Sequence, residues 1–172
     1  MQEQTDVIII RGCPASGKSQ TAKSLSKLFP KGVRMEVDTL RQMVISVDWE
    51  NQQEHIDMLY ASTKLVFEFL RLNFYPIIVV DTFSGDKINS FIENLYLMDN
   101  GLKIKIIGLY TTDKELINRL EKRTNQEFKD LTICKMINND VLKWKKDNEF
   151  QINTTSLSPI QTAAKVFEHI NS

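Results

Sequence analysis

The segment from Gly12 to Ser19, GCPASGKS, carries the residues of this chain best suited to chemistry on phosphates. It fits the spacing G-x-x-x-x-G-K-[S/T], in which glycines let the backbone curl so that successive N–H groups point inward. That concavity and the N-terminus of a following helix bind phosphate oxygens. Lys18 can reach the β- and γ-phosphates as a point charge, and the Ser19 hydroxyl can bind Mg²⁺. The segment therefore predicts a phosphate-binding loop.

The sequence on either side of this loop supplies the context that such a loop needs. A continuous apolar strand is expected over Val7–Arg11, and a helix over Lys18–Phe29 with Ala22, Leu25 and Leu28 on one face. An ordinary glycine turn between a strand and a helix is the alternative interpretation. Ligands of open α/β sheets bind beyond the carboxyl ends of the strands, so the rest of the site is expected where the other strands end.

The second predicted strand, Val33–Val37, is followed by the sequence DTLR. Asp38 could accept the proton of an attacking hydroxyl, and Arg41 could hold an anionic group of a substrate. The alternative is that Asp38 caps a helix and that Arg41 is a solvated charge. Thr39 and Gln42 form a T-x-x-Q capping box at the expected start of a short helix, which leaves Asp38 free for chemistry.

The third predicted strand, IIVV, ends on Asp81. An apolar strand that ends in aspartate is the Walker B pattern, and its carboxylate supports Mg²⁺ next to a phosphate loop. The alternative is an aspartate that only begins a turn, because the following DTFSGD is turn-like. Together with the phosphate loop, the pattern favours a metal or substrate role for Asp81.

A helix from Thr112 to Arg123 follows the fourth predicted strand, and its apolar residues define one buried stripe: Leu116, Ile117 and Leu120. At about 100° per residue, Arg119 and Arg123 flank that stripe on one side, and Lys122 points nearly opposite. The two arginines could turn inward over a nucleotide, and the polar segment after them could form a mobile lid. A charged surface helix is the alternative.

The remaining sequence alternates between helical and strand patterns. The other expected elements are helices over Gln53–Asn73, Ile88–Met98 and Thr132–Lys146, strands over 103–110 and 150–154, and a last helix capped by Ser158, Pro159 and Gln161. Apolar strands separated by helices predict an α/β fold with a mainly parallel sheet of about five strands.

Composition narrows the class of protein. The chain has 172 residues, of which 42% are hydrophobic, and Lys+Arg and Asp+Glu balance at 22 each. A neutral total gives no support for general binding to nucleic acid or to an anionic membrane, although a local basic groove stays open. With no membrane span and no signal peptide in evidence, we expect a cytoplasmic protein.

Histidine and cysteine are too scarce for several kinds of site. The two histidines argue against histidine-rich metal sites and histidine-based triads, and His55, at the start of a long amphipathic helix, is expected at the surface. The two cysteines, Cys13 and Cys134, match neither a disulfide framework nor a zinc spacing, and they fit a reducing compartment.

These motifs together resemble the P-loop kinase superfamily, in particular the branch of polynucleotide kinase, zeta-toxin and chloramphenicol phosphotransferase. The matching segments are GCPASGKS, VDTLR, IIVVD, NRLEKR and INTTSLSPIQTAAKVFEHI. The resemblance implies a single kinase-like domain over residues 1–172, in three layers, with a five-stranded parallel sheet in the order 2-3-1-4-5. Within this domain, the sequence itself allows a substrate flap at about residues 39–60 and a lid at about 119–131.

The resemblance further implies ATP with Mg²⁺ as donor and a hydroxyl as acceptor. Carried over, Lys18, Asp38 and Arg123 are catalytic, Arg41 and Asp81 join Asp38 at the acceptor, and the metal is held by Ser19 and Asp81. The implied nucleotide-binding residues are Gly12, Cys13, Pro14, Ala15, Ser16, Gly17, Lys18, Ser19, Gln20, Arg119 and Arg123. Gln20 stands where the family usually has a threonine that contacts the α-phosphate.

The sequence thus favours an ATP-dependent phosphotransferase. The rival is an ATPase or nucleotide-dependent switch that acts on a partner protein without an acceptor, and a third hypothesis is a nucleotide-binding protein without turnover. Asp38 and Arg41 favour the enzyme, because a switch needs no general base there. A nucleic-acid end, a nucleoside, a nucleotide sugar and an antibiotic all remain candidate acceptors, and the sequence predicts no oligomeric state.

Overall fold

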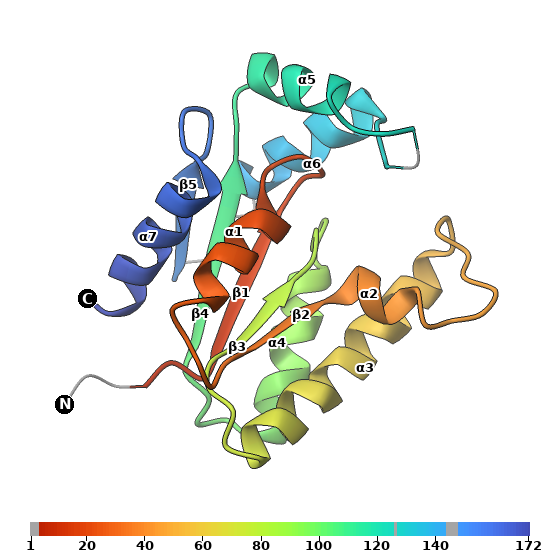
Figure 1. The fold of residues 1–172 in the computed structure, drawn as a ribbon. Coiled ribbons are helices and arrows are strands. Elements are labelled where there is room, and N and C mark those ends of the chain that lie inside the picture. The colour runs from red at the N-terminus through yellow and green to blue at the C-terminus, as the bar shows by residue number, and fades with distance from the viewer. Residues whose placement is uncertain (1–3, 126, 144–147) are drawn as a thin grey trace.

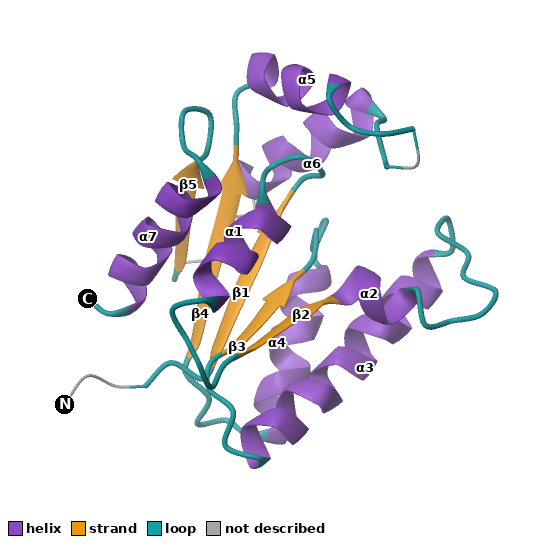
Figure 2. Cartoon of the chain, in the orientation of Figure 1, coloured by secondary structure: helices purple, strands orange, loops and turns teal. Residues whose placement is uncertain are grey.

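The computed structural model describes residues 4–125, 127–143 and 148–172. Its elements in chain order (Figures 1 and 2) are β1 (Val7–Gly12), α1 (Lys18–Ser26), β2 (Val33–Glu36), α2 (Val37–Arg41), α3 (Gln52–Arg71), β3 (Ile77–Val80), α4 (Lys87–Met98), β4 (Ile104–Tyr110), α5 (Asp113–Glu121), α6 (Leu131–Lys143), β5 (Glu149–Asn153) and α7 (Pro159–Ile170).

All five strands form one parallel sheet in the order β2-β3-β1-β4-β5, which confirms the predicted class and strand order. The central strand, β1, is buried along its whole length, and Val7 pairs with Ile77 on one side and Ile104 on the other. Burial on both faces explains why β1 reads as an unbroken apolar run.

Helices cover both faces of this sheet, because alternate residues of each strand point in opposite directions. Ile8 and Ile10 pack with residues of α1 and α7, whereas Val7 and Ile9 pack with residues of α3 and α4. In Figure 1, α1 and α7 lie in front of the sheet, and α4 and α6 lie behind it. The result is a three-layer arrangement with a core on each side of the sheet.

The parallel strands bring their carboxyl ends to one edge of the sheet. In Figure 2, the loops that follow β1, β3, β4 and β5 all lie at this edge. Segments far apart in the sequence therefore meet there: the loop between β1 and α1, the turn after β3 and the turn between β5 and α7. This edge is where ligands of open α/β sheets bind.

A buried ion pair anchors β5 to the central strand directly below that edge. Arg11 donates from Nε to Glu149 Oε1 at 3.1 Å and from Nη2 to Glu149 Oε2 at 2.8 Å, and neither side chain is more than 1% exposed. Such a two-point pair has a defined geometry, since the planar guanidinium matches the carboxylate. The pair fixes β1 at the residue before Gly12.

The start of α2 differs from the prediction. The helix begins at Val37 with Glu36 as its N-cap residue, and no side chain caps it. Thr39 therefore lies inside the first turn, where it cannot act as the N-cap, and the predicted Thr39–Gln42 capping box is wrong. The reason is that β2 ends at Glu36 and passes straight into the helix, without the loop residues that a capping box requires.

Side chains do cap the first turns of α7 and α5. At α7, Ser158 accepts a hydrogen bond from the Gln161 N–H, and Gln161 accepts one from the Ser158 N–H, so this capping box is confirmed. At α5, Thr112 is the N-cap residue and accepts a hydrogen bond from the Glu115 N–H at 3.4 Å, and the Glu115 carboxylate binds Arg119.

Several helix ends also shift by a few residues. The helix α1 ends at Ser26 rather than Phe29, and α5 ends at Glu121 rather than Arg123. The structure describes α6 up to Lys143, so the last residues of the predicted Thr132–Lys146 helix lie outside the described residues. Within the described ranges, no helix is both long and apolar enough to cross a membrane.

Candidate functional site

The loop between β1 and α1 has the geometry of a phosphate cradle. A Cβ on Gly12 would lie 2.5 Å from the Leu109 carbonyl oxygen and 2.6 Å from Ser16 Oγ, so only glycine fits there. Gly17, the residue before α1, has φ 99°, a conformation that side chains disfavour. The sequence thus folds into a tight curl that leads into a helix N-terminus, as the motif predicts.

Lys18 closes this loop. Its Nζ donates to the Cys13 carbonyl oxygen at 2.9 Å, so the side chain lies back across the loop. Burial lowers the pKa of Lys18, while the carboxylates of Asp81 and Asp38 oppose that shift. Both strand-end carboxylates therefore lie within electrostatic reach of the loop lysine, and the structure brings these three predicted site residues together.

The Cys13 side chain has a packing role in the structure. It is fully buried in a small cluster with Leu116, Leu120 and Cys134, and its Sγ lies 3.6 Å from the Asn138 side-chain oxygen. Burial raises the pKa of the Cys13 thiol to about 11, so the reactive thiolate is scarce at neutral pH. This side chain fastens the phosphate loop to α5 and α6.

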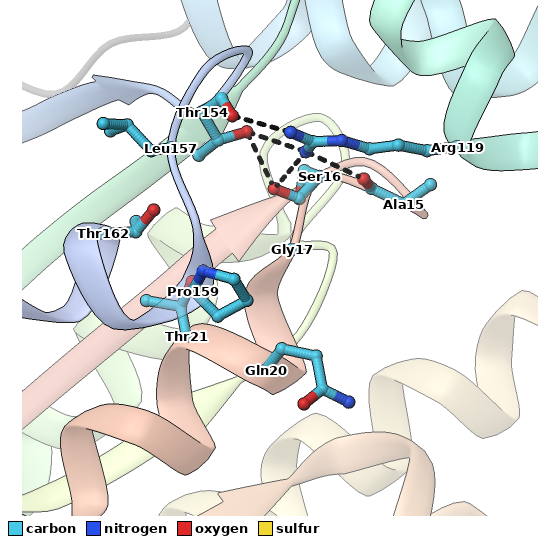
Figure 3. A pocket seen from close by; sticks show the side chains of 10 residues that line it. All are labelled: Ala15, Ser16, Gly17, Gln20, Thr21, Arg119, Thr154, Leu157, Pro159 and Thr162. Atoms are coloured by element: carbon cyan, nitrogen blue, oxygen red, sulfur yellow. Dashed lines mark hydrogen bonds between the residues drawn. The ribbon is translucent and has the colours of Figure 1, made fainter.

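A cavity of about 310 Å³ opens on the α7 side of the loop (Figure 3). It is lined by Ala15, Ser16, Gly17, Gln20, Thr21, Arg119, Thr154, Leu157, Pro159 and Thr162. The loop backbone and Arg119 form one wall, and the turn between β5 and α7 forms another. Ala15, Ser16 and Gly17 of the predicted loop, together with Gln20 and Arg119, thus share one cavity with the turn between β5 and α7.

Arg119 bridges two backbone segments of this cavity. It donates to the carbonyl oxygens of Ala15 and Ser16 at 3.4 Å each, to Thr154 Oγ1 at 3.0 Å and to the Thr154 carbonyl oxygen at 2.6 Å. Glu115, one turn earlier on α5, holds the Arg119 Nε at 2.8 Å. The guanidinium is thereby fixed beside the loop, as its helical phase predicts.

Arg123 and Lys122 lie differently from Arg119. The Arg123 side chain is 25% exposed and binds Glu127 and the Phe128 carbonyl oxygen, so it holds the segment after α5 rather than the phosphate loop. Its charge is nevertheless among those that lower the pKa of Lys18. Lys122 is exposed, as its phase predicts.

Asp81 lies buried at the end of β3 with both carboxylate oxygens engaged. Oδ2 accepts from the Phe83 N–H at 2.8 Å, and Oδ1 lies 3.0 Å from His55 Nε2. Burial alone would raise the pKa of Asp81, but the His55 hydrogen bond, the Phe83 N–H and Lys18 together lower it. The carboxylate is therefore held in its ionised form.

Asp38, in the first turn of α2, has the opposite shift. Desolvation by surrounding groups raises its pKa, and the nearby charge of Asp81 raises it further, against the pull of Lys18, His55 and Arg41. Two carboxylates at adjacent strand ends thus have pKa values displaced in opposite directions. Such a divergence is typical of sites that carry acid–base chemistry.

His55 is buried, so the expectation of a surface residue is wrong. Its exposed fraction is 7%, and its imidazole contacts Asp81, 26 positions later in the chain. The signal lay in the helical spacing, because His55 shares the buried stripe of α3 with Leu59, Ser62 and Val66. Ile56, the next residue of α3, is exposed.

Arg41 is buried rather than solvated. Its Nη2 donates to the Asp48 carbonyl oxygen at 2.8 Å and lies 3.4 Å from Glu54 Oε1, and its guanidinium carbon lies 4.7 Å from the centre of the Trp49 ring. These contacts tie the connection between α2 and α3 together. The buried Nε has no hydrogen-bond partner among the described residues.

Ser19 reaches a carboxylate that the sequence did not single out. Its hydroxyl donates to Glu36 Oε2 at 2.8 Å, and Glu36 is the last residue of β2. Because the proton goes to Glu36, the Ser19 oxygen keeps lone pairs for a cation. Ser19, Glu36 and Asp81 are oxygen donors of the kind that Mg²⁺ prefers.

No cluster of three or more His, Cys, Asp or Glu residues suited to holding a metal occurs within the described residues. This is compatible with Mg²⁺, because that ion usually keeps several waters and is held by one or two carboxylates together with substrate phosphates. The donor set therefore fits Mg²⁺ bound with a nucleotide rather than by the protein alone.

Comparison with known proteins assigns the chain to a family. A family model described as an AAA domain matches residues 8–143. No sequence among the curated proteins matches the chain.

Solved structures with the same fold are numerous. The tunicamycin resistance protein of Deinococcus radiodurans superposes with a TM-score of 0.68 at 20% identity, over 97% of this chain and 96% of the other. A putative kinase from Chloroflexus aurantiacus gives 0.72 at 14% identity, over 97% and 99%. Shikimate kinase from Acinetobacter baumannii gives 0.62 at 13% identity, over 98% and 94%. At these identities the likeness shows the fold.

Proposed function

We propose that this chain, which belongs to the AAA domain family and has the fold of the P-loop kinases, moves the γ-phosphoryl group of ATP to a hydroxyl group. The observation that carries the proposal is electrostatic. Lys18 of the phosphate loop lies within reach of two strand-end carboxylates, Asp38 and Asp81. The phosphate loop could thus hold the donor with Asp38, the proposed base, close to it.

The donor would be held by the phosphate loop and the cavity next to it. The backbone N–H groups of Gly12–Ser19 would bind the phosphates, and Lys18 would leave the Cys13 carbonyl to contact the β- and γ-phosphates. Arg119 and the turn around Thr154 would flank the rest of the nucleotide. Catalysis by such a site is mainly positioning and charge neutralisation.

Ser19 and Asp81 would hold Mg²⁺, with Glu36 accepting the Ser19 proton. The bound ion would neutralise charge on the β- and γ-phosphates. Arg123, on the segment of about 119–131 proposed as a lid, would add positive charge when that segment closes. The family implies this role for Arg123, and its electrostatic link to Lys18 supports it.

The acceptor would bind between Asp38 and the connection that follows α2. Asp38 would take the proton of the acceptor hydroxyl as the phosphoryl group is transferred. Its raised pKa makes it a stronger base than an ordinary aspartate. Arg41 would contribute by ordering the proposed flap of about 39–60 through Asp48, Trp49 and Glu54, with its Nε left for the substrate.

A second candidate is an ATPase or switch that acts on a partner without an acceptor. Product analysis with labelled ATP separates the two. Tunicamycin, shikimate and a short oligonucleotide with a 5′-hydroxyl are reasonable first acceptors, because structural neighbours include a tunicamycin resistance protein, a shikimate kinase and an RNA repair complex. Label in an acceptor supports the kinase, whereas phosphate release that no acceptor stimulates contradicts it.

A further inference from the structure

We propose that His55 is a positioning residue: it fixes the Asp81 carboxylate beside the phosphate loop, and Lys87 in turn fixes the His55 imidazole. The proposal rests on the proposed phosphotransfer. It adds two residues, His55 and Lys87, that neither the sequence motifs nor the family assignment singles out.

The three side chains come from three elements and form one chain of contacts. His55 Nε2, on α3, lies 3.0 Å from Asp81 Oδ1, directly after β3. His55 Nδ1 lies 3.1 Å from Nζ of Lys87, the first residue of α4. His55 and Asp81 are 7% and 4% exposed, so water competes little for these contacts.

The direction of each hydrogen bond follows from the donor and acceptor groups. A lysine ammonium can only donate, so His55 Nδ1 must accept from Lys87 and must carry no proton. Nε2 then carries the ring proton and donates it in the hydrogen bond to the Asp81 carboxylate. Gln52, one turn before His55 on α3, accepts a second bond from Lys87 Nζ at 2.7 Å and keeps the ammonium in place.

The other oxygen of Asp81 is fixed by the backbone. Phe83 donates its N–H to Oδ2 at 2.8 Å, and it does so in a left-handed conformation with φ 48°, which is uncommon for a bulky residue. Phe83 is fully buried, and its ring centre lies 5.1 Å from that of Phe91. Strain of this kind persists where the surroundings hold it, and it concentrates at functional sites.

A carboxylate held at both oxygens has one orientation and still has acceptor capacity. Each oxygen can accept a second hydrogen bond or bind a cation. Lys18 and Asp38 both interact electrostatically with Asp81, so the fixed group faces the proposed chemistry rather than a remote part of the fold. Groups that orient such ligands in this way typically contribute about 10–100-fold to activity or metal affinity.

Two substitutions at His55 separate positioning from packing. His55→Gln can place an amide N–H near the former Nε2 and keep the bond to Asp81, whereas His55→Leu removes that bond. We expect kcat to fall about 10–100-fold in His55→Leu and to recover most of that loss in His55→Gln. His169→Leu is the matched control, because the other histidine stacks on Phe150 with ring centres 4.1 Å apart and lies on α7. It should leave kcat unchanged.

Two further measurements do not depend on turnover. Nitrogen NMR of the imidazole should show Nε2 protonated and Nδ1 unprotonated, and Lys87→Met should change that distribution. Calorimetry should show weaker binding of Mg²⁺·ADP to His55→Leu and near-normal binding to His55→Gln, with ADP binding in the absence of Mg²⁺ unchanged. These measurements test the role of His55 even if no acceptor is phosphorylated. A failure to phosphorylate any acceptor would count against the proposed phosphotransfer and not against the positioning of Asp81 by His55.

The proposal is overturned by an Nδ1-protonated ring in the wild-type protein. It is also overturned if both His55 variants have a lower melting temperature but keep the wild-type kcat and Mg²⁺·ADP affinity. His55 would then contribute only to the packing of the core. If His55→Leu fails to fold, His55→Gln and Lys87→Met still test the proposal. If Lys87→Met has the same imidazole signals and the same Mg²⁺·ADP affinity as the wild type, Lys87 does not fix the His55 ring.

Discussion

The two sides of the phosphate loop hold their polar side chains in different ways. On the α5–α7 side, Arg119 binds backbone carbonyl oxygens of the loop and of Thr154. On the α2–α3 side, polar side chains bind mainly one another, as in the His55–Asp81 and Arg41–Glu54 pairs. The first arrangement follows the path of the main chain, and the second depends on which side chains are present.

This difference bears on which side of the proposed site depends on particular side chains. A site built on backbone carbonyls and amides tolerates wide changes in sequence, which would suit the proposed nucleotide site. A site built from side-chain pairs changes with each substitution, which suits an acceptor that differs among proteins of one fold. The predictions below test this division by damaging one side at a time.

The largest effect is expected from Lys18→Ala, which removes the only side-chain cation of the phosphate motif. ATP affinity should fall by more than about 100-fold, because the phosphates lose a charged partner in a partly buried site. The fold should survive, since the bond that is lost joins Lys18 to one loop carbonyl. Calorimetry measures the affinity, and circular dichroism checks the fold.

Lys23→Ala is the matched control, because Lys23 lies exposed on the same helix. Its ATP affinity should equal that of the wild type. A folded Lys18→Ala protein with unchanged ATP affinity would refute the phosphate loop itself, and with it both sides of the comparison.

Asp38→Asn should damage the acceptor side alone. Asparagine keeps the shape but is a far weaker base, and general-base catalysis contributes about 10²–10⁴-fold. The transfer rate should drop by that amount while ATP affinity stays unchanged. Asp99→Asn, at an exposed aspartate directly after α4, serves as the control. A wild-type transfer rate in Asp38→Asn would remove Asp38 from the mechanism.

The carboxyl group of Asp38 should also give the wild-type transfer rate a pH dependence. Because desolvation by neighbouring groups and the charge of Asp81 raise the pKa of Asp38 above the usual 3.8, its protonated form, which cannot accept a proton, persists to a higher pH. The wild-type rate should therefore fall as the pH drops through that raised pKa, and Asp38→Asn should lack this acid limb. ATP affinity, measured over the same range, should show no matching fall.

Much of this molecule could be predicted from local sequence. The unbroken apolar strands, the helices between them and the phosphate motif are each encoded within a few adjacent residues, so the sheet and the loop followed. The inward position of Arg119 and the exposure of Lys122 also followed, because helical phase is a local property.

What could not be predicted depends on contacts between distant residues. The contact of His55 with Asp81 and the contacts of Arg41 with Asp48, Trp49 and Glu54 have no local sequence pattern that names the partner. Glu36 was missed for the same reason, since Ser19 lies in another element. The α2–α3 side, where the acceptor is proposed to bind, is thus the part that sequence motifs describe least.

A smaller effect is expected from Arg119→Ala on the nucleotide side. The variant loses four hydrogen bonds to the loop and to Thr154, two of them long. ATP affinity should fall about 10–100-fold, in line with about 1.5–3 kcal/mol for hydrogen bonds to a charged group. Lys122→Ala, at the residue directly after α5, should bind ATP like the wild type. A larger loss in Lys122→Ala than in Arg119→Ala would reverse the assigned helical phase.

The smallest effect concerns two helix starts, one on each side of the loop. Ser158 caps α7 through a complete capping box, whereas Thr39 lies inside the first turn of α2 and caps nothing. Ser158→Ala should therefore lower the free energy of unfolding by about 1 kcal/mol, the usual contribution of a serine cap. Thr39→Ala should change it by less than about 0.5 kcal/mol, as surface substitutions generally do. Urea denaturation without nucleotide compares the two variants directly. If Thr39→Ala cost as much as Ser158→Ala, α2 would begin at Thr39 in solution. Asp38 would then precede the helix instead of lying in its first turn, and the placement of the proposed base would have to change.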